Sequence, residues 1–165
     1  MQTSVYVGVI DRVKGPAVWG VTVTDKSSLI MHESYSTENI FNDIALVRLL
    51  TTIVRDPNLG LISLPTRTEA STNLEGKVAT IAGFGSYTDT SGPSEKLRFV
   101  QNSIVANSVC EKIYGKTKVL GTNICLQGTG GKSSCQGDSG INKNCSKILN
   151  FLIACTFISR WWIAP

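Results

Sequence analysis

Short apolar and β-branched runs, broken at close intervals by turn residues, limit the possible folds of this chain more than any other feature. The turn signals are Gly15-Pro16, Asp56-Pro57-Asn58, residues 88–93 and residues 128–131. The strand-like runs between them are Val5–Ile10, Val21–Thr24, Ile44–Leu49, Val78–Gly85 and Leu97–Val105. Short strands with frequent turns predict an all-β fold, either a sandwich or a barrel. One short helix is expected from Ser108 to Tyr114, with Asn107 or Ser108 as its cap.

Composition predicts a single globular domain and excludes several classes of function. The 165 residues are 42% hydrophobic and 17% charged, and the net charge of +4 is spread without a long basic run. Nucleic acid is therefore not an expected partner. With one histidine and no Cys-x-x-Cys, the sequence predicts neither a structural zinc site nor another metal or cofactor.

The two ends of the chain carry no membrane or secretion signal. The first residues lack the basic start and apolar run of a signal peptide. The apolar stretch Ile148–Ile158 is too short for a membrane span, which needs roughly 18 residues. The cysteine count of five is odd, so in an extracellular protein at least one cysteine is unpaired or joins another chain.

The segment Gly131–Gly140, with the sequence GKSSCQGDSG, is the most specific motif in the chain. A reactive serine hydroxyl has to be presented on a tight turn, and the glycines on either side of Asp138-Ser139 permit such a backbone. The N–H groups of Gly137 and Ser139 are then able to point at one spot and hold a developing oxyanion.

This segment resembles the nucleophile loop of the trypsin/chymotrypsin family of serine proteases. The resemblance implies that Ser139 is the nucleophile and that Gly137 and Ser139 form the oxyanion hole. It implies that Asp138 is the carboxylate that pairs with the new N-terminus after zymogen cleavage. Ser133 would lie at the base of the primary specificity pocket. A serine there implies a chymotrypsin-, elastase- or collagenase-like preference, of the insect or crustacean kind, rather than a tryptic one.

Further segments resemble the same family in the expected order. Asn42–Leu49 is similar to the family's second signature, which implies that Asp43 orients the catalytic histidine. Residues 82–85 are similar to its Gly-Trp-Gly turn, with Phe84 in place of tryptophan. Cys110 and Cys125 match a family disulfide around the expected helix.

The sequence also departs from the family pattern. It contains no Thr-Ala-Ala-His-Cys segment with the general base and no Ile-Val-Gly-Gly start, so we expect Asp138 to have no terminal ammonium to pair with. Its one histidine, His32, precedes Asp43 by eleven positions and is expected to be a surface or loop residue. The match stops after Gly140, which predicts an incomplete protease domain over residues 1–140 and a non-homologous apolar tail over 141–165. Cys135 then lacks its family partner.

The resemblance implies that this all-β chain is part of a double Greek-key β-barrel from a secreted serine endopeptidase family. The expected partners are a polypeptide substrate or a protease inhibitor. Without the histidine and the remaining pocket walls, the chain as given is expected to be inactive. The alternative is a non-catalytic pseudoprotease that binds a partner, or a truncated gene product.

Overall fold

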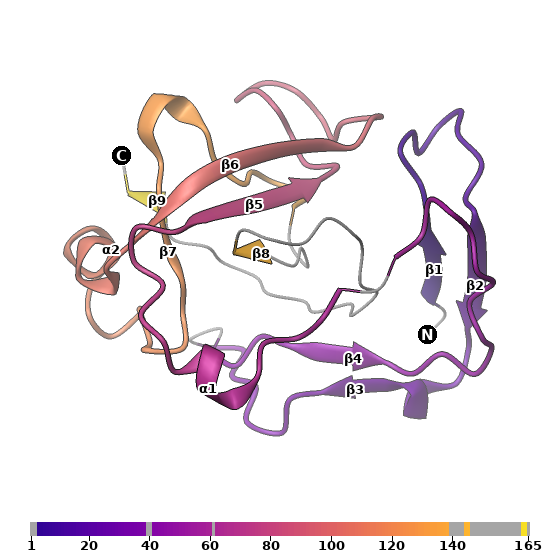
Figure 1. Cartoon of the computed structure of the whole chain (residues 1–165), viewed down its shortest axis with the longest axis horizontal. Coiled ribbons are helices and arrows are strands. Elements are labelled where there is room, and N and C mark those ends of the chain that lie inside the picture. The colour runs from indigo at the N-terminus through magenta and orange to yellow at the C-terminus, as the bar shows by residue number, and fades with distance from the viewer. Residues whose placement is uncertain (1–2, 39–40, 61, 139–143, 146–162, 165) are drawn as a thin grey trace.

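A computed structural model of the chain describes residues 3–38, 41–60, 62–138, 144–145 and 163–164. Its strands form three sheets, as Figure 1 shows. Two sheets are antiparallel pairs, β1 (Thr3–Val7) with β2 (Trp19–Val23) and β3 (Leu29–Met31) with β4 (Ala45–Val47). The third has the order β8-β5-β6-β7-β9, with bounds β5 (Val78–Gly83), β6 (Arg98–Val105), β7 (Cys125–Gln127), β8 (Asn144–Cys145) and β9 (Ile163–Ala164). Strands make up most of the regular secondary structure of the described residues, as the sequence predicts.

The helices differ in detail from the prediction. Helix α2 (Asn107–Tyr114) begins one residue earlier than expected, its N-cap is Ala106, and no side chain caps it. The expected cap was wrong because the amide of Asn107 donates instead to the carbonyl oxygens of Leu120 and Asn123.

Three further helical turns were not predicted. Helix α1 (Arg67–Ala70) is a single turn held by a capping box between Thr66 and Glu69. The hydrogen bonds that Thr66 donates to the Glu69 carboxylate lower the pKa of Glu69. Two 3-10 turns complete the set, η1 (Lys26–Ser28) and η2 (Thr129–Gly131), and η2 falls within a predicted turn.

The larger hydrophobic core lies in the second half of the chain. Ala79, Ile81, Ile104 and Leu126 are buried together between strands β5, β6 and β7. A second cluster of Cys110, Val119 and Cys125 packs under helix α2. In the first half, the buried apolar side chains are few, namely Val5, Val7, Val23 and Ile62 among the described residues. The five-stranded sheet is therefore the stable platform of the fold, since burial of apolar surface is the main favourable term in folding.

Arg12 joins the first half of the chain to the five-stranded sheet. Its backbone N–H donates to the Glu95 carbonyl at 2.8 Å and its Nε to the Ser94 carbonyl at 2.8 Å. Ser94 is only 3% exposed, and its backbone N–H donates to the Phe84 carbonyl. This polar link fixes the β1–β2 ribbon against the turn that follows β5.

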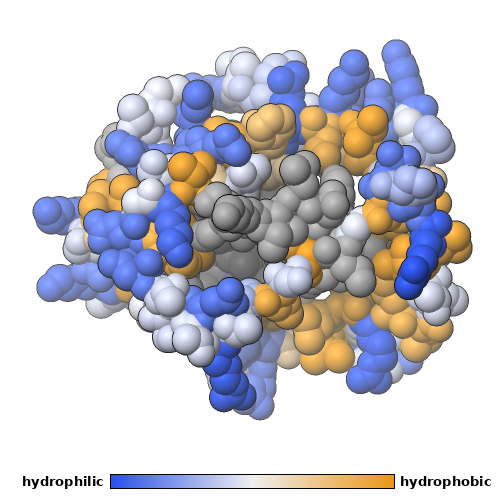
Figure 2. Space-filling model, in the orientation of Figure 1, coloured by the Kyte–Doolittle hydropathy of each residue, from blue (hydrophilic) through white to orange (hydrophobic). Residues whose placement is uncertain are grey.

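The β3–β4 ribbon leaves apolar side chains in solvent. Ile30 and Leu46 are direct cross-strand partners and are 40% and 52% exposed, and Ile44 on the same side is exposed as well. In Figure 2, hydrophobic residues are interspersed with polar ones over the lower and right-hand parts of the surface. Two-stranded ribbons are marginally stable alone, and unpaired strand edges with apolar residues favour self-association.

We therefore predict that Leu46→Lys reduces self-association of the chain. The new charge replaces an exposed leucine beside a strand edge, and such charges oppose edge-to-edge pairing. Sedimentation velocity at several concentrations should show a larger monomer fraction. Ser4→Lys adds the same charge on the exposed face of β1 and is the control. An equal gain from both variants would show that net charge, and not the β3–β4 ribbon, governs association.

Candidate active site

The turn at residues 135–138 is closed by reciprocal hydrogen bonds. The backbone N–H of Asp138 donates to the Cys135 carbonyl at 3.0 Å, and the Cys135 N–H donates to Asp138 Oδ2 at 3.0 Å. Gly137 has a φ of +92°, a left-handed conformation that favours glycine. Ser139, the predicted nucleophile and second oxyanion donor, lies outside the described residues. The structure thus defines the backbone leading up to the serine.

Three hydrogen bonds attach this segment to the β5–β6 hairpin. The buried Gly85 N–H donates to Asp138 Oδ1 at 2.7 Å, and the Ser86 N–H donates to the Gln136 carbonyl at 2.8 Å. Nδ2 of Asn102 donates to the Lys132 carbonyl at 2.7 Å. Both carboxylate oxygens of Asp138 therefore accept backbone amides, one from the hairpin and one from its own turn. Whether Asp138 lacks a terminal ammonium partner stays a prediction.

Ser133 lies between these anchors, in an extended stretch that follows η2. It is exposed, while the carbonyl of the preceding residue is held by Asn102. Cys135 is exposed and free in the described part of the chain. The segment is thus fixed through its backbone and leaves these two side chains accessible.

Asp43 lies two residues before β4, far along the chain from the turn at residues 135–138. The preceding residue, Asn42, has a φ of +54°, and its side-chain amide donates to the Ser34 carbonyl at 2.9 Å. Asparagine tolerates this left-handed conformation better than most residues. From Asp43 to Arg48 the residues alternate between half-buried and exposed, and Asp43 is on the half-buried side.

His32 directly follows β3 in the same ribbon. Its N–H donates to the Ile44 carbonyl at 3.0 Å, which continues the β3–β4 register and places it across from exposed Ile44. Asp43, the residue before Ile44, is half-buried, whereas His32 and Ile44 are exposed. The His32 ring is exposed, and its Nδ1 accepts the N–H of Ser34 at 3.1 Å. As predicted, His32 is a surface residue.

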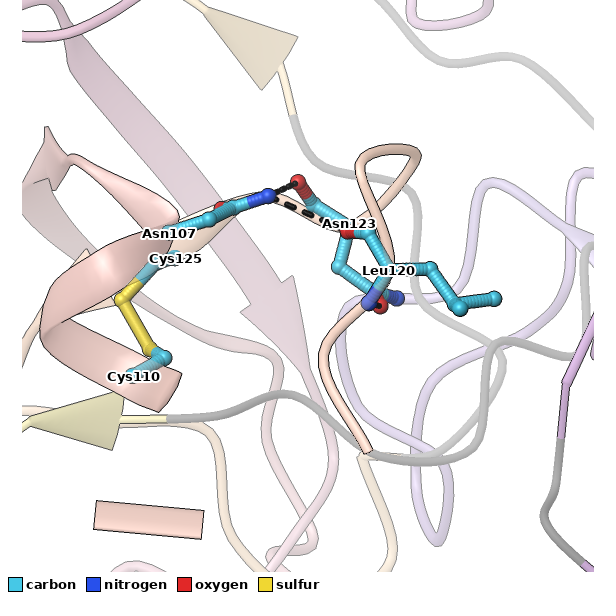
Figure 3. The surroundings of a disulfide bond; sticks show 5 residues. All are labelled: Asn107, Cys110, Leu120, Asn123 and Cys125. Carbon is cyan, nitrogen blue, oxygen red and sulfur yellow. Dashed lines mark hydrogen bonds between the residues drawn. A yellow bond between two sulfur atoms is a disulfide. The ribbon is translucent and has the colours of Figure 1, made fainter. Parts of the chain in front are cut away.

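The predicted disulfide between Cys110 and Cys125 is present and ties helix α2 to strand β7 (Figure 3). Figure 3 also shows the Asn107 amide pointing from the helix at Leu120 and Asn123. Asn123 Oδ1 in turn accepts the Leu120 N–H at 2.7 Å. This network closes the loop between the two cysteines on the side of the sheet next to the second core cluster.

No group of three or more potential metal ligands occurs among the described residues. Over the same residues, no helix has the length and apolar character needed to cross a bilayer.

Comparison with known proteins identifies the family. Residues 3–153 match the sequence model named Trypsin. The chain belongs to the trypsin family. The recognised family is thereby confirmed, although the roles of its individual residues stay predictions.

Several arthropod members of the trypsin family are similar in sequence. Chymotrypsin of Phaedon cochleariae is 34% identical over 120 residues, which are 73% of this chain and 42% of that protein. Brachyurin of Leptuca pugilator is 38% identical over 112 residues, 67% of this chain and 46% of that protein. Trypsin alpha of Drosophila melanogaster is 35% identical over 144 residues, 83% and 54% respectively. The chain spans about half the length of these relatives.

A solved member of the same fold supports the architecture. The structure titled HL collagenase, at 1.7 Å resolution, superposes with a TM-score of 0.74 over 96% of this chain and 67% of the other. At 24% sequence identity the likeness concerns the fold alone. It confirms the predicted chymotrypsin-like all-β class, with sheets that remain open in the described part of the chain.

Two residues that support this trypsin-family loop were not assigned a role from the sequence. Asn102 lies between Val100 and Ile104 on the inward face of β6 and is 7% exposed. A polar residue at an apolar position of a strand was the available signal. Gly85 was recognised as part of a turn, but its contact with Asp138 joins residues 53 positions apart. Nothing local in the sequence indicates that contact.

We predict that Asn102→Ala destabilises the chain by about 1–3 kcal/mol, since it leaves the Lys132 carbonyl without its donor. The adjacent Gln101 is exposed and donates to Thr80 on the outer face, so Gln101→Ala should change stability by less than about 0.5 kcal/mol. Urea unfolding midpoints give both values. Equal effects of the two variants would contradict the anchoring role of Asn102.

We further predict that removing the disulfide with Cys110→Ser and Cys125→Ser together lowers stability by about 3 kcal/mol. The bond closes a loop with a sequence separation of 15 residues and restricts the unfolded chain. The free Cys135→Ser variant is the control and should change the midpoint little. Under non-reducing conditions, alkylation of Cys110 in oxidised protein would disprove the bond.

Proposed function

We propose that this chain supplies the nucleophile loop and the orienting aspartate of a serine protease, and that these 165 residues alone do not hydrolyse peptides. The observation that carries the proposal is the position of His32. It is the one histidine of the sequence, and it is exposed across from exposed Ile44, whereas Asp43 is half-buried. An exposed imidazole there does not share the half-buried environment of the carboxylate that would have to orient it.

The chemistry that the family resemblance assigns to this chain needs such a base. Ser139 attacks a peptide carbonyl only as a histidine removes its proton, and Asp43 would hold that imidazole in the required tautomer. The N–H groups of Gly137 and Ser139 would stabilise the oxyanion of the tetrahedral intermediate. Ser133, neutral and exposed beside the anchored Lys132 carbonyl, supports a preference for uncharged side chains at the primary pocket. The partner class is a polypeptide.

A second candidate is a non-catalytic protein that binds a polypeptide substrate or an inhibitor. The anchored segment 132–138 favours it, because a surface that is held in shape by three hydrogen bonds binds a partner at lower entropic cost. Reaction with a fluorophosphonate distinguishes the candidates, since it requires an activated Ser139 and binding does not.

For location, we propose an extracellular or other oxidising compartment. The disulfide between Cys110 and Cys125 supports it, because such bonds persist in secreted proteins and are rare in the cytosol.

We predict no measurable turnover of a chymotrypsin-type peptide substrate by the purified chain. Loss of the histidine from a serine-protease triad costs on the order of 10⁶ in turnover. A fluorogenic peptide assay, with Ser139→Ala as the matched control, should give equal background rates. A fluorophosphonate probe should label neither protein above the level of the denatured chain.

His32→Gln makes the test decisive. Any histidine-dependent activity of these 165 residues has to come from His32, so turnover that disappears in both Ser139→Ala and His32→Gln would overturn the proposal. Turnover that both His32→Gln and Ser139→Ala retain comes from a contaminating protease.

A further inference from the structure

Gly85 is placed where no other residue fits without displacing Asp138. A Cβ built on Gly85 would lie 2.5 Å from Asp138 Oδ1 and closer still to Cγ and Oδ2 of the same carboxylate. Real Cβ atoms do not approach other atoms so closely. The missing side chain therefore opens the space in which the carboxylate reaches the Gly85 N–H at 2.7 Å.

Glycine is required at position 85 by the close contact with the Asp138 carboxylate and not by the backbone conformation. Gly85 does not have a positive φ, whereas Gly137 does. The two glycines nevertheless face each other, since a Cβ on Gly137 would lie 3.3 Å from the Gly85 Cα. The nucleophile turn and the turn after β5 are thus packed backbone against backbone, with the Asp138 carboxylate between their amides.

The carboxylate joins the two turns because each oxygen has its own donor. Oδ1 accepts from Gly85, on the hairpin, and Oδ2 accepts from Cys135, at the start of the nucleophile turn. Hydrogen bonds to a charged group are stronger than those between neutral groups. Both donors are backbone amides, whose positions are already set by the fold.

We propose that Gly85 is a positioning residue for the nucleophile loop: by lacking a side chain, it admits the Asp138 carboxylate, which locks the 135–138 turn onto the β5–β6 hairpin. Two backbone amides then hold the Asp138 end of the loop, one on each carboxylate oxygen. The consequence for Ser139, the next residue, rests on the proposed function. The lock itself concerns Gly85, Cys135 and Asp138 only.

The test is a double-mutant cycle of Gly85→Ala and Asp138→Ala, read by amide hydrogen exchange resolved to residues 85 and 135. In the wild-type background, Gly85→Ala should accelerate exchange at both amides about tenfold or more, as expected for losing hydrogen bonds to a charged acceptor. In the Asp138→Ala background, exchange is already fast and the added methyl group meets no carboxylate. There Gly85→Ala should change the rates less than about twofold.

Gly92→Ala is the matched control. Gly92 lies in the same β5–β6 connection and does not have a positive φ. A Cβ built on it would have no heavy atom within 4 Å. This variant should leave both amides protected. Equal acceleration by Gly85→Ala in the two backgrounds, or none in the wild type, would overturn the proposal, because residue 85 would then act through its own backbone or not at all.

Asp138→Asn keeps the test informative if Gly85→Ala does not fold. An asparagine retains one acceptor oxygen in place of two, so one of the two amides should lose protection while the other keeps it. Full protection of both amides would contradict the lock. Peptide turnover by the wild-type chain would defeat the proposed function and leave the exchange cycle unaffected, so the two failures are distinguishable.

Discussion

The segment before the predicted nucleophile depends on one constraint: a backbone that is not part of a sheet still has to satisfy its polar groups. Residues 132–138 are not in a strand, so their carbonyl and amide groups take partners from the β5–β6 hairpin. Asn102 and Ser86 donate to the Lys132 and Gln136 carbonyls, and Gly85 donates to the Asp138 carboxylate. The hairpin is able to do this because its inward face, which carries Asn102, is fixed by the largest core cluster of the described residues. Core packing thus fixes the position of the β5–β6 hairpin, and the hairpin in turn fixes the position of residues 132–138.

The same contacts extend to the first half of the chain. Arg12 donates to the Ser94 carbonyl, Ser94 donates to the Phe84 carbonyl, and the next residue, Gly85, donates to Asp138. A continuous series of hydrogen bonds therefore runs from the β1–β2 ribbon to the nucleophile turn. Asp43 belongs to the thinly packed first half and Gly137 to the well-packed second half. Their relative placement depends on this link and not on a shared core.

The sequence predicts the strands well where alternation and turn residues coincide. The Val78 and Leu97 runs became β5 and β6, but the first run ends as a strand at Val7 because Gly8 adopts a φ of +70°. The short strands β3 and β7 contain three residues each, too few for a periodic pattern. Helix α1 has a readable capping box, yet four residues give no hydrophobic period. Asn107 was assigned a capping role that tertiary contacts overrode.

For the candidate site, the sequence identified the residue types and missed the partners. Motifs indicated Asp43, Gly137, Asp138 and the disulfide, because each requires a particular side chain or a glycine. The partners of Asp138 are backbone amides, which every residue except proline carries, so no residue type marks them. Even Gly85 was visible only as a turn residue.

That difference explains why the amide partners of Asp138 were not predicted. Side-chain charges can be read from a sequence, whereas the positions of backbone donors cannot. In the described part of the chain, fixed N–H dipoles hold the Asp138 carboxylate, and a backbone donor requires no ordering of a long side chain. The steric requirement then moves to the donor: the closer a carboxylate approaches a backbone amide, the less room remains for a Cβ on that residue. A buried glycine without a positive φ, such as Gly85, therefore indicates that another group approaches its backbone closely.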